Sequence, residues 1–155
     1  MNNMLELILG PMYSGKTTAL LSRRSGNVLI VNHELDTRVN GVGTHDGIEA
    51  HAIKCKVLPR LSGYDMYLID EAQFFDSLEG VELLAPHVIV AGLSGDYMRR
   101  PFGKLLELIP KADKVTFLKA KCKCGAPASF TKRLSTGKYI VNAHADYIPV
   151  CGTCY

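Results

Sequence analysis

Apolar residues gather in five short runs that are separated by longer polar stretches. The runs occupy residues 5–9, 28–32, 66–69, 88–91 and 115–118. The runs carry apolar residues on both faces rather than on one, which is typical of strands in a parallel sheet with both faces covered. Helical candidates lie between the runs at 16–24, 76–84 and 102–109. The alternation predicts an α/β fold with a doubly wound, mostly parallel sheet over residues 1–118.

Two regions depart from this alternation. Residues 37–59 contain three glycines and little periodicity before a short candidate strand at 50–54, so we interpret them as a loop near a ligand. From residue 119 onward, cysteines, glycines, prolines and short alternating runs indicate a small metal-stabilised lobe. The chain is therefore expected to divide into an α/β domain at 1–118 and a small lobe at 119–155.

A phosphate-binding motif follows the first apolar run directly. Residues 10–17 read Gly-Pro-Met-Tyr-Ser-Gly-Lys-Thr and match the P-loop pattern G-x-x-x-x-G-K-[ST]. Such a loop turns its backbone N–H groups, and the positive end of the next helix, toward phosphate oxygens. Lys16 is placed to reach the β- and γ-phosphates, and the Thr17 hydroxyl to bind Mg²⁺. A chance glycine-rich turn is the alternative, which the position after a strand disfavours. The residues expected around the phosphates are Gly10, Pro11, Met12, Tyr13, Ser14, Gly15, Lys16 and Thr17.

An acidic pair ends the third apolar run, which continues into Asp70, Glu71, Ala72 and Gln73. In P-loop proteins an acid at the carboxyl end of a strand beside the loop organises Mg²⁺, a role that suits Asp70. Glu71 is placed to accept a proton from an attacking hydroxyl or water. In a chain without a P-loop, the same residues would be read as a solvated strand end.

Two other segments follow predicted strands at the edge of the sheet where ligands bind. Asp36, Thr37 and Arg38 follow the second run; Asp36 is a candidate for holding Mg²⁺ through water, and Arg38 for neutralising phosphoryl charge. An ordinary capped turn explains this tripeptide equally well. Residues 92–103 follow the fourth run and carry Tyr97, whose ring is a candidate for stacking on a planar base. A turn with a core aromatic is the more usual explanation of that segment taken alone.

Four of the five cysteines form two close pairs, and the fifth, Cys55, is interpreted as a packing residue. The pairs have C-x-C and C-x-x-C spacing and are separated by 26 residues in the sequence. Four thiolates on two turns are typical of a closed structural zinc site, which leaves no position open for chemistry. Four buried or oxidised cysteines are the alternative. The expected zinc ligands are Cys122, Cys124, Cys151 and Cys154.

Composition narrows the class of protein further. The 155 residues, 47% hydrophobic and 21% charged, have the balance of a globular domain with a small appendage. A net charge of +3 suits an anionic substrate but is weak for a nucleic-acid surface. No apolar run approaches the roughly 18 residues of a membrane span. The first strand starts within four residues, so we expect no signal peptide, no membrane partner and a cytoplasmic location.

Taken in order, these motifs resemble those of the type II thymidine kinases, the class with a P-loop and a zinc ribbon. The pairing of Gly-Pro-Met-Tyr-Ser-Gly-Lys with Asp-Glu-Ala-Gln-Phe-Phe is far more specific than a bare P-loop. The resemblance covers nearly the whole chain and implies a RecA-like P-loop NTPase fold with a zinc-ribbon lobe that carries a substrate lasso. The matching stretches are 8–18, 36–38, 44–46, 69–75, 100–103, 131–134 and 147–151.

The resemblance implies transfer of the γ-phosphoryl group of ATP to the 5′-hydroxyl of thymidine, and of deoxyuridine, in nucleotide salvage. It implies Glu71 as the general base, with Lys16 and Arg38 in the catalytic group. Mg²⁺ would be held by Thr17, Asp36 and Asp70. The implied nucleotide contacts include 36–38 and 70–73. The implied nucleoside contacts are Met12, Phe74, Leu93, Tyr97, Thr131, Tyr139, Ile140, Val141, Asn142 and Tyr147. Feedback inhibition by dTTP and a homotetramer are further implications.

The chain departs from the family pattern at several places. The segment between Lys16 and Val28 is shorter than usual, which implies a truncated first helix and an altered subunit contact. The first cysteine pair is C-x-C, and Asn142-Ala143 replaces the usual Gly-Gly of the lasso. None of these changes removes a residue implied in the chemistry.

Three other interpretations remain as alternatives. A DNA-dependent ATPase with a zinc ribbon would explain the P-loop and the acidic motif, although helicase motors need two ATPase lobes and a basic stripe. A related nucleoside kinase with a different base preference would explain every motif. A non-catalytic zinc-ribbon module would leave Lys16, Asp70 and Glu71 without a purpose.

Overall fold

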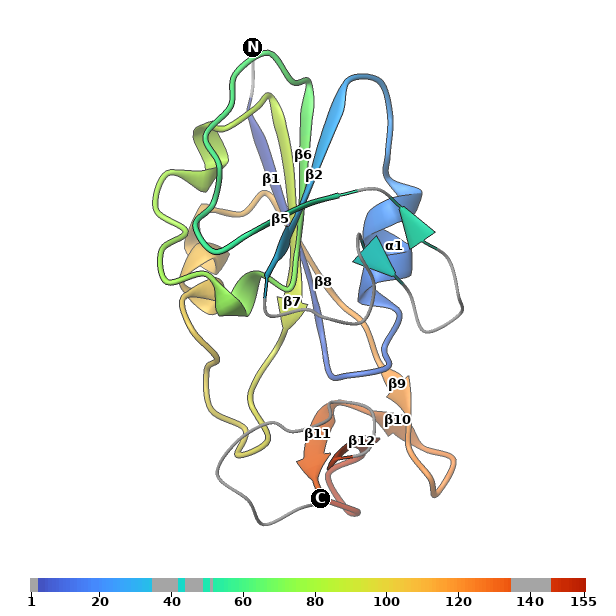
Figure 1. Cartoon of the computed structure of the whole chain (residues 1–155). Coiled ribbons are helices and arrows are strands. Elements are labelled where there is room, and N and C mark those ends of the chain that lie inside the picture. The colour runs from blue at the N-terminus through green and yellow to red at the C-terminus, as the bar shows by residue number, and fades with distance from the viewer. Residues whose placement is uncertain (1–2, 35–41, 44–48, 51, 135–145) are drawn as a thin grey trace.

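A six-stranded parallel sheet forms the centre of the protein (Figure 1). The computed structural model describes residues 3–34, 42–43, 49–50, 52–134 and 146–155. The strand order is β5-β2-β6-β7-β1-β8, and every pair in this sheet is parallel. All five predicted strands are present. β1, β2, β6 and β7 are buried along nearly their whole length, whereas β8 lies at the edge of the sheet and is only partly covered. The strands are β1 (Met4–Gly10), β2 (Val28–His33), β5 (Ile53–Cys55), β6 (Met66–Asp70), β7 (His87–Leu93) and β8 (Lys114–Phe117).

Helical segments cover both faces of the sheet, as the doubly wound prediction requires. On one face, Leu20 and Leu21 of helix α1 (Lys16–Ser22) pack into a cluster with Ile8, Leu68 and Ile89. The opposite face carries three 3₁₀ helices and a larger apolar cluster (Figure 1). These are η1 (Ala72–Phe74), η2 (Val81–Leu83) and η3 (Leu105–Lys111).

Two of the predicted helices are wrong in type and extent. The segment 76–84 contains Gly80 at φ 70°, a left-handed conformation that interrupts an α-helix, so only Val81–Leu83 is helical. The segment 102–109 gives way to η3, a 3₁₀ helix with Pro110 inside it. In the described part of the chain, no helix has the length and apolar character needed to cross a membrane.

Glu6 is a buried acid in the amino-terminal half of β1. Glu6 is 5% exposed and accepts hydrogen bonds from both terminal nitrogens of Arg23, at 2.5 and 3.0 Å. His87 of β7 lies 3.3 Å from the same carboxylate. These contacts hold the pKa of Glu6 below its ordinary value, the Arg23 hydrogen bonds being the largest cause. Arg23 is the residue directly after α1, so the pair ties the end of the helix to the sheet.

A second structural unit, which we call the cysteine lobe (residues 120–133 and 146–155), lies beyond the carboxyl ends of the strands (Figure 1). It contains two antiparallel strand pairs, β9 with β10 and β11 with β12. Cys122, Ala128 and Val150 form its small buried centre. The domain division at residues 118 and 119 stays a prediction. The remaining strands are β3 (Val42–Gly43), β4 (Glu49–Ala50), β9 (Ala120–Lys121), β10 (Pro127–Ala128), β11 (Phe130–Arg133) and β12 (Tyr147–Val150).

Candidate functional site

The P-loop connects β1 directly to α1. Gly10 ends the strand at a place where a Cβ atom would lie 2.7 Å from the carbonyl oxygen of Leu118, so only glycine fits without a shift. Gly15 precedes the helix at φ 82°, in the left-handed region that glycine favours. Tyr13 is also left-handed, at φ 64°. The hydroxyl of Ser14 donates to the carbonyl of Pro11 at 2.8 Å and closes the loop.

Lys16 lies inside the curve of this loop. Its side chain is 93% buried, and its Nζ donates to the carbonyl oxygen of Pro11 at 2.6 Å and to Ser14 Oγ at 3.4 Å. The ammonium group therefore faces the concave side of the loop that phosphate groups occupy in P-loop proteins. A phosphate there would replace neutral oxygen acceptors by charged ones, which bind an ammonium more strongly.

A hydrogen bond joins the P-loop to the acidic motif. Thr17 Oγ1 donates to Asp70 Oδ2 at 2.8 Å, and both residues are buried. Asp70 ends β6, and β7 lies between β6 and β1 in the sheet. A hydroxyl beside a carboxylate offers the hard oxygen donors that Mg²⁺ prefers, so this pair fits the ion. The third expected Mg²⁺ residue, Asp36, lies outside the described residues.

Glu71 follows Asp70 in a left-handed conformation, at φ 52°. Its Oε2 accepts a hydrogen bond from Gln73 Nε2 at 2.5 Å, and Gln73 Oε1 accepts one from the N–H of Leu93 at 3.1 Å. Gln73 is 98% buried, and a Cβ atom on Gly103 would lie only 2.3 Å from its carbonyl oxygen. The amide that contacts Glu71 is therefore held from β7, and the backbone of Gln73 packs closely against Gly103.

The described residues expected around a base come from several separate parts of the chain. Met12 of the P-loop donates its N–H to Thr131 Oγ1 of β11 at 3.1 Å. Phe74 packs edge-on against Phe102 with ring centroids 5.5 Å apart. Half-buried Leu93 ends β7. The expected residues Thr37, Arg38, Tyr139, Ile140, Val141 and Asn142 lie outside the described part of the chain.

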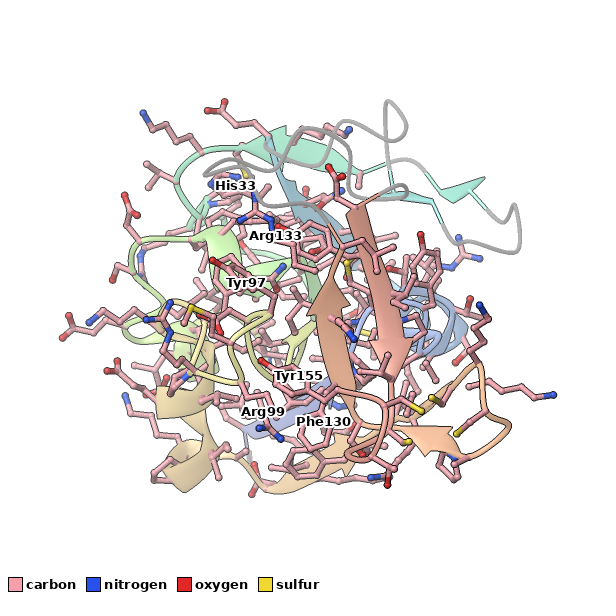
Figure 2. All side chains as sticks on the ribbon, turned by 90° about the horizontal axis from the view of Figure 1, so that it is seen from below. His33, Tyr97, Arg99, Phe130, Arg133 and Tyr155 are labelled. Atoms are coloured by element: carbon pink, nitrogen blue, oxygen red, sulfur yellow. The ribbon has the colours of Figure 1, made fainter. Side chains whose placement is uncertain are left out.

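The aromatic ring of Tyr97 packs against residues of the cysteine lobe (Figure 2). The guanidinium of Arg133 lies 5.1 Å from the centroid of the Tyr97 ring, and the centroid of the Tyr147 ring lies 6.4 Å away. Tyr147 is 6% exposed, and burial is the main cause that raises the pKa of its hydroxyl. Tyr147 therefore stays a neutral hydrogen-bond donor near neutral pH.

The four paired cysteines converge in the cysteine lobe. Their sulfur atoms all lie within 4.8 Å of one another, and Cys124 Sγ and Cys151 Sγ are 3.7 Å apart. A tetrahedral site with zinc–sulfur bonds of about 2.3 Å has sulfur atoms about 3.8 Å apart, so the cluster fits structural zinc. Gly125, at φ 92°, donates its N–H to the carbonyl of Cys122 at 2.8 Å. This turn lets the C-x-C pair present both sulfurs to the cluster.

A comparison with protein families agrees with these features. A family model described as thymidine kinase matches residues 3–155. The chain belongs to the thymidine kinase family. Relatives with that name include a rice protein, 39% identical over 97% of this chain, and a monkeypox virus protein, 38% identical over 97%. Thymidine kinase a of Arabidopsis thaliana is 38% identical over the same share.

The relatives differ in length from this member of the thymidine kinase family. The alignment covers 96% of the monkeypox virus protein, 74% of the Arabidopsis protein and 65% of the rice protein. The chain therefore spans just under two thirds of the rice relative and nearly all of the viral one. A thymidine kinase is an enzyme, and the motifs that first indicated this family lie within the matched residues.

Several contacts of this family member were not foreseen from its sequence. Arg99, Phe130 and Tyr155 contact one another beside Tyr97, although Tyr155 carries no motif of its own. Gly103 packs against the backbone of Gln73; residues 100–103 matched the family pattern, but the sequence did not indicate this contact. These contacts join segments that are distant in the chain, which no local pattern reveals.

Proposed function

We propose that the protein is a thymidine kinase that transfers the γ-phosphoryl group of ATP to the 5′-hydroxyl of thymidine and yields dTMP and ADP. The observation that carries this proposal is the 2.8 Å hydrogen bond from Thr17 to Asp70, in a chain of the thymidine kinase family. It joins the two halves of a nucleotide phosphate site that are 53 residues apart in the sequence. Deoxyuridine, which lacks only the 5-methyl group of the base, is proposed as a second substrate.

The donor site consists of residues 10–17 with the acidic motif at 70–73. Backbone N–H groups of the loop and the Lys16 ammonium bind and orient the β- and γ-phosphates. Thr17 Oγ1 and the Asp70 carboxylate would hold Mg²⁺, together with Asp36. When bound, Mg²⁺ neutralises charge that develops on the phosphate oxygens. Thr37 and Arg38 complete the proposed nucleotide contacts, with Arg38 acting on the transferred group.

Glu71 is the proposed general base. As the 5′-oxygen of thymidine forms its bond to the γ-phosphorus, the bond from that phosphorus to the β-phosphate oxygen breaks, and ADP leaves. Glu71 takes the proton of the 5′-hydroxyl in the same step. Gln73 holds Oε2 of this carboxylate from β7, which supports a fixed orientation of the base.

The thymine ring is proposed to bind between Tyr97 and the cysteine lobe. Tyr97, Phe74, Met12 and Leu93 would supply apolar surface, and Thr131 and Tyr147 would line the lobe side. Residues 139–142, as a lasso over the base, would bind its polar edge through backbone groups. Zinc on the four cysteines would hold β9, β11 and β12 in the arrangement that this pocket needs.

Two properties implied by the family resemblance, and the location expected from the sequence, remain part of the proposal. dTTP is the proposed feedback inhibitor, because it carries the nucleoside and the phosphates of the two sites in one molecule. The assembly is proposed to be a homo-oligomer, a tetramer by resemblance to the family. The proposed location is the cytoplasm, with neither nucleic acid nor membrane as a partner.

A phosphoryl-transfer assay tests the proposal. ATP with Mg²⁺ is offered together with thymidine, deoxyuridine, deoxycytidine or a purine deoxynucleoside, and single-stranded DNA is tested as an activator of ATP hydrolysis. We expect monophosphate from thymidine and deoxyuridine only. Phosphorylation of a deoxynucleoside with another base, and not of thymidine, would indicate a related nucleoside kinase. DNA-stimulated hydrolysis without any phosphorylated nucleoside would refute the kinase function and leave the P-loop site standing.

A further inference from the structure

The segment that carries Tyr97 is tied to the cysteine lobe by a direct hydrogen bond. Tyr155 Oη donates to the backbone carbonyl oxygen of Tyr97 at 2.6 Å, across 58 residues of sequence. Tyr155 follows Cys154, one of the four clustered cysteines. The backbone of the proposed base-stacking residue is therefore fixed to a residue next to the metal-ligand cluster.

A guanidinium group strengthens the same connection. The Cζ atom of Arg99 lies 4.0 Å from the ring centroid of Tyr155 and 5.1 Å from that of Phe130, and the two rings meet edge-on (Figure 2). A cation over an aromatic face is attracted by the negative charge of the ring. Arg99 thus connects its own segment to Phe130 in β11 and to Tyr155. We call Arg99, Phe130 and Tyr155 the aromatic latch.

The segment between Asp96 and Arg100 is a turn that is closed by its own hydrogen bonds. The backbone N–H of Asp96 donates to the carbonyl of Arg100 at 2.8 Å, and the N–H of Arg99 donates to the carbonyl of Asp96 at 3.0 Å. Asp96 Oδ1 accepts from the N–H groups of Met98 and Arg100, each at 2.9 Å. Because these hydrogen bonds fix the shape of the turn, contacts to Arg99 and to the Tyr97 carbonyl also fix the position of the Tyr97 ring.

The cysteine lobe is itself anchored to the P-loop. Thr131, the residue after Phe130 in β11, accepts the hydrogen bond from the Met12 N–H at 3.1 Å. On the same strand, Arg133 lies 5.1 Å from the ring of Tyr97. One short strand therefore contacts the phosphate loop, the latch and the Tyr97 ring.

We propose that Tyr155 and Arg99 are positioning residues for the nucleoside, because the aromatic latch holds the Tyr97 turn at a set distance from β11. This inference rests on the proposed thymidine kinase activity. In the described part of the chain, the latch is connected to the P-loop through Thr131, the residue after Phe130 in β11. Loss of the latch is therefore expected to weaken thymidine binding and to leave ATP binding unchanged.

Two small substitutions and a matched control test the proposal in the full-length chain. Tyr155→Phe removes one hydroxyl and keeps the ring, and Arg99→Met removes the charge and keeps an unbranched chain. Tyr64→Phe is the control, because Tyr64 lies just before β6 at the amino ends of the strands and contacts Tyr67 through its ring. Measured quantities are KM for thymidine, KM for ATP, kcat, the Kd of thymidine by calorimetry, zinc content and the thermal midpoint.

For Tyr155→Phe we expect the KM and Kd of thymidine to rise about threefold to tenfold, the range for losing one hydrogen bond. For Arg99→Met we expect a rise of about twofold to fivefold, in keeping with an exposed cation–π contact. In both variants, KM for ATP and the zinc content stay within twofold of the parent. In the double variant, the Kd of thymidine should rise by less than the product of the two single rises, because both groups hold the same turn.

The possible outcomes separate this inference from the function on which it rests. If the parent protein phosphorylates no thymidine, the proposed function fails, whatever the variants do. If the parent is active and both variants keep the parent Kd for thymidine, the latch has no positioning role. Equal losses for ATP and thymidine together with a lower thermal midpoint would mean that the latch only stabilises the fold, which also overturns the proposal.

Discussion

Gln73 and Glu71 are joined by a hydrogen bond of 2.5 Å, in which the side-chain amide donates to the carboxylate. The other end of the amide accepts the N–H of Leu93 at 3.1 Å, so a flip of the amide would break both contacts. Glu71 is left-handed, at φ 52°, and precedes η1. The orientation of Glu71, the proposed base, therefore depends on Gln73, a buried residue two positions further along the chain. Gln73 is in turn held by β7.

Replacing Gln73 by Ala should lower kcat about tenfold and change KM for ATP less than twofold. The reason is that a misoriented base loses alignment with the 5′-hydroxyl, at a cost of roughly 1–2 kcal/mol in the transition state. Steady-state kinetics check this. The control is Asn27→Ala, which removes an exposed amide that donates to the Gly63 carbonyl. An unchanged kcat for the Gln73 variant would mean that the contact does not position the base.

Replacing Glu71 by Gln should lower kcat at least about 100-fold, because a positioned general base contributes roughly 10²–10⁴ to the rate. The amide keeps the shape of the side chain and takes up no proton, so ATP binding should persist. Calorimetric titration with a non-hydrolysable ATP analogue measures that binding. The matched control is Glu79→Gln, an exposed glutamate. Turnover at the parent rate would remove Glu71 from the proposed mechanism.

Replacing Cys151 by Ser should release zinc and loosen the cysteine lobe. Structural zinc contributes several kcal/mol to folding, so the thermal midpoint should fall by roughly 5–10 °C. Elemental analysis and calorimetry measure the two quantities. Cys55→Ser is the control, because Cys55 lies on β5 and outside the cluster of four sulfurs. A zinc-free variant with the parent midpoint and full activity would contradict the structural role of the metal.

The contact between Arg23 and Glu6 should make stability depend on pH in the acid range. Its hydrogen bonds lower the pKa of Glu6 in the folded protein below the unfolded value of about 4.3. The contact therefore adds stability above that pH, and the contribution is lost as the pH falls through the folded value. Glu6→Gln should cost about 1–2 kcal/mol at pH 7, and the difference should close below about pH 4.

Thermal melts of the Glu6 variant and the parent between pH 3 and pH 8 measure this dependence. The control is Glu107→Gln, because Glu107 is exposed and its pair with Lys104 spans 3.8 Å. Surface pairs of that kind contribute little, so its melting curve should follow the parent at every pH. If the thermal midpoints of Glu6→Gln and the parent differ by the same amount at every acid pH, the difference does not arise from the ionisation of Glu6.

The strands could be predicted from the sequence because the signal for each is local. Short runs with apolar residues on both faces, set between polar stretches, mark the strands, and β1, β2, β6, β7 and β8 all lie where such runs occur. The helices were predicted less well. In 76–84 the backbone of Gly80 is left-handed, and in 102–109 the predicted α-helix is replaced by a 3₁₀ helix that contains Pro110.

The candidate site shows the same division. Residues 10–17 and 70–73 were chosen for their chemistry, and the structure brings Thr17 and Asp70 into contact. The contact from Leu93 to Gln73 was not foreseen, because it depends on which strands are neighbours in the sheet. The connection from Tyr155 to Tyr97 was not foreseen either, since the two residues meet only after the cysteine lobe has packed beyond the carboxyl edge.

The sequence by itself determined the strands, the phosphate loop, the acidic motif and the cysteine spacing, because each depends on residues within a few positions of one another. The tertiary structure alone decided which of these groups touch: Thr17 with Asp70, Glu6 with Arg23, and Tyr155 with Tyr97. The order of strands and the packing of the lobe set those distances. Both arise from burial of apolar surface. The free energy of this burial depends on the area removed from water and not on how far apart the residues are in the sequence.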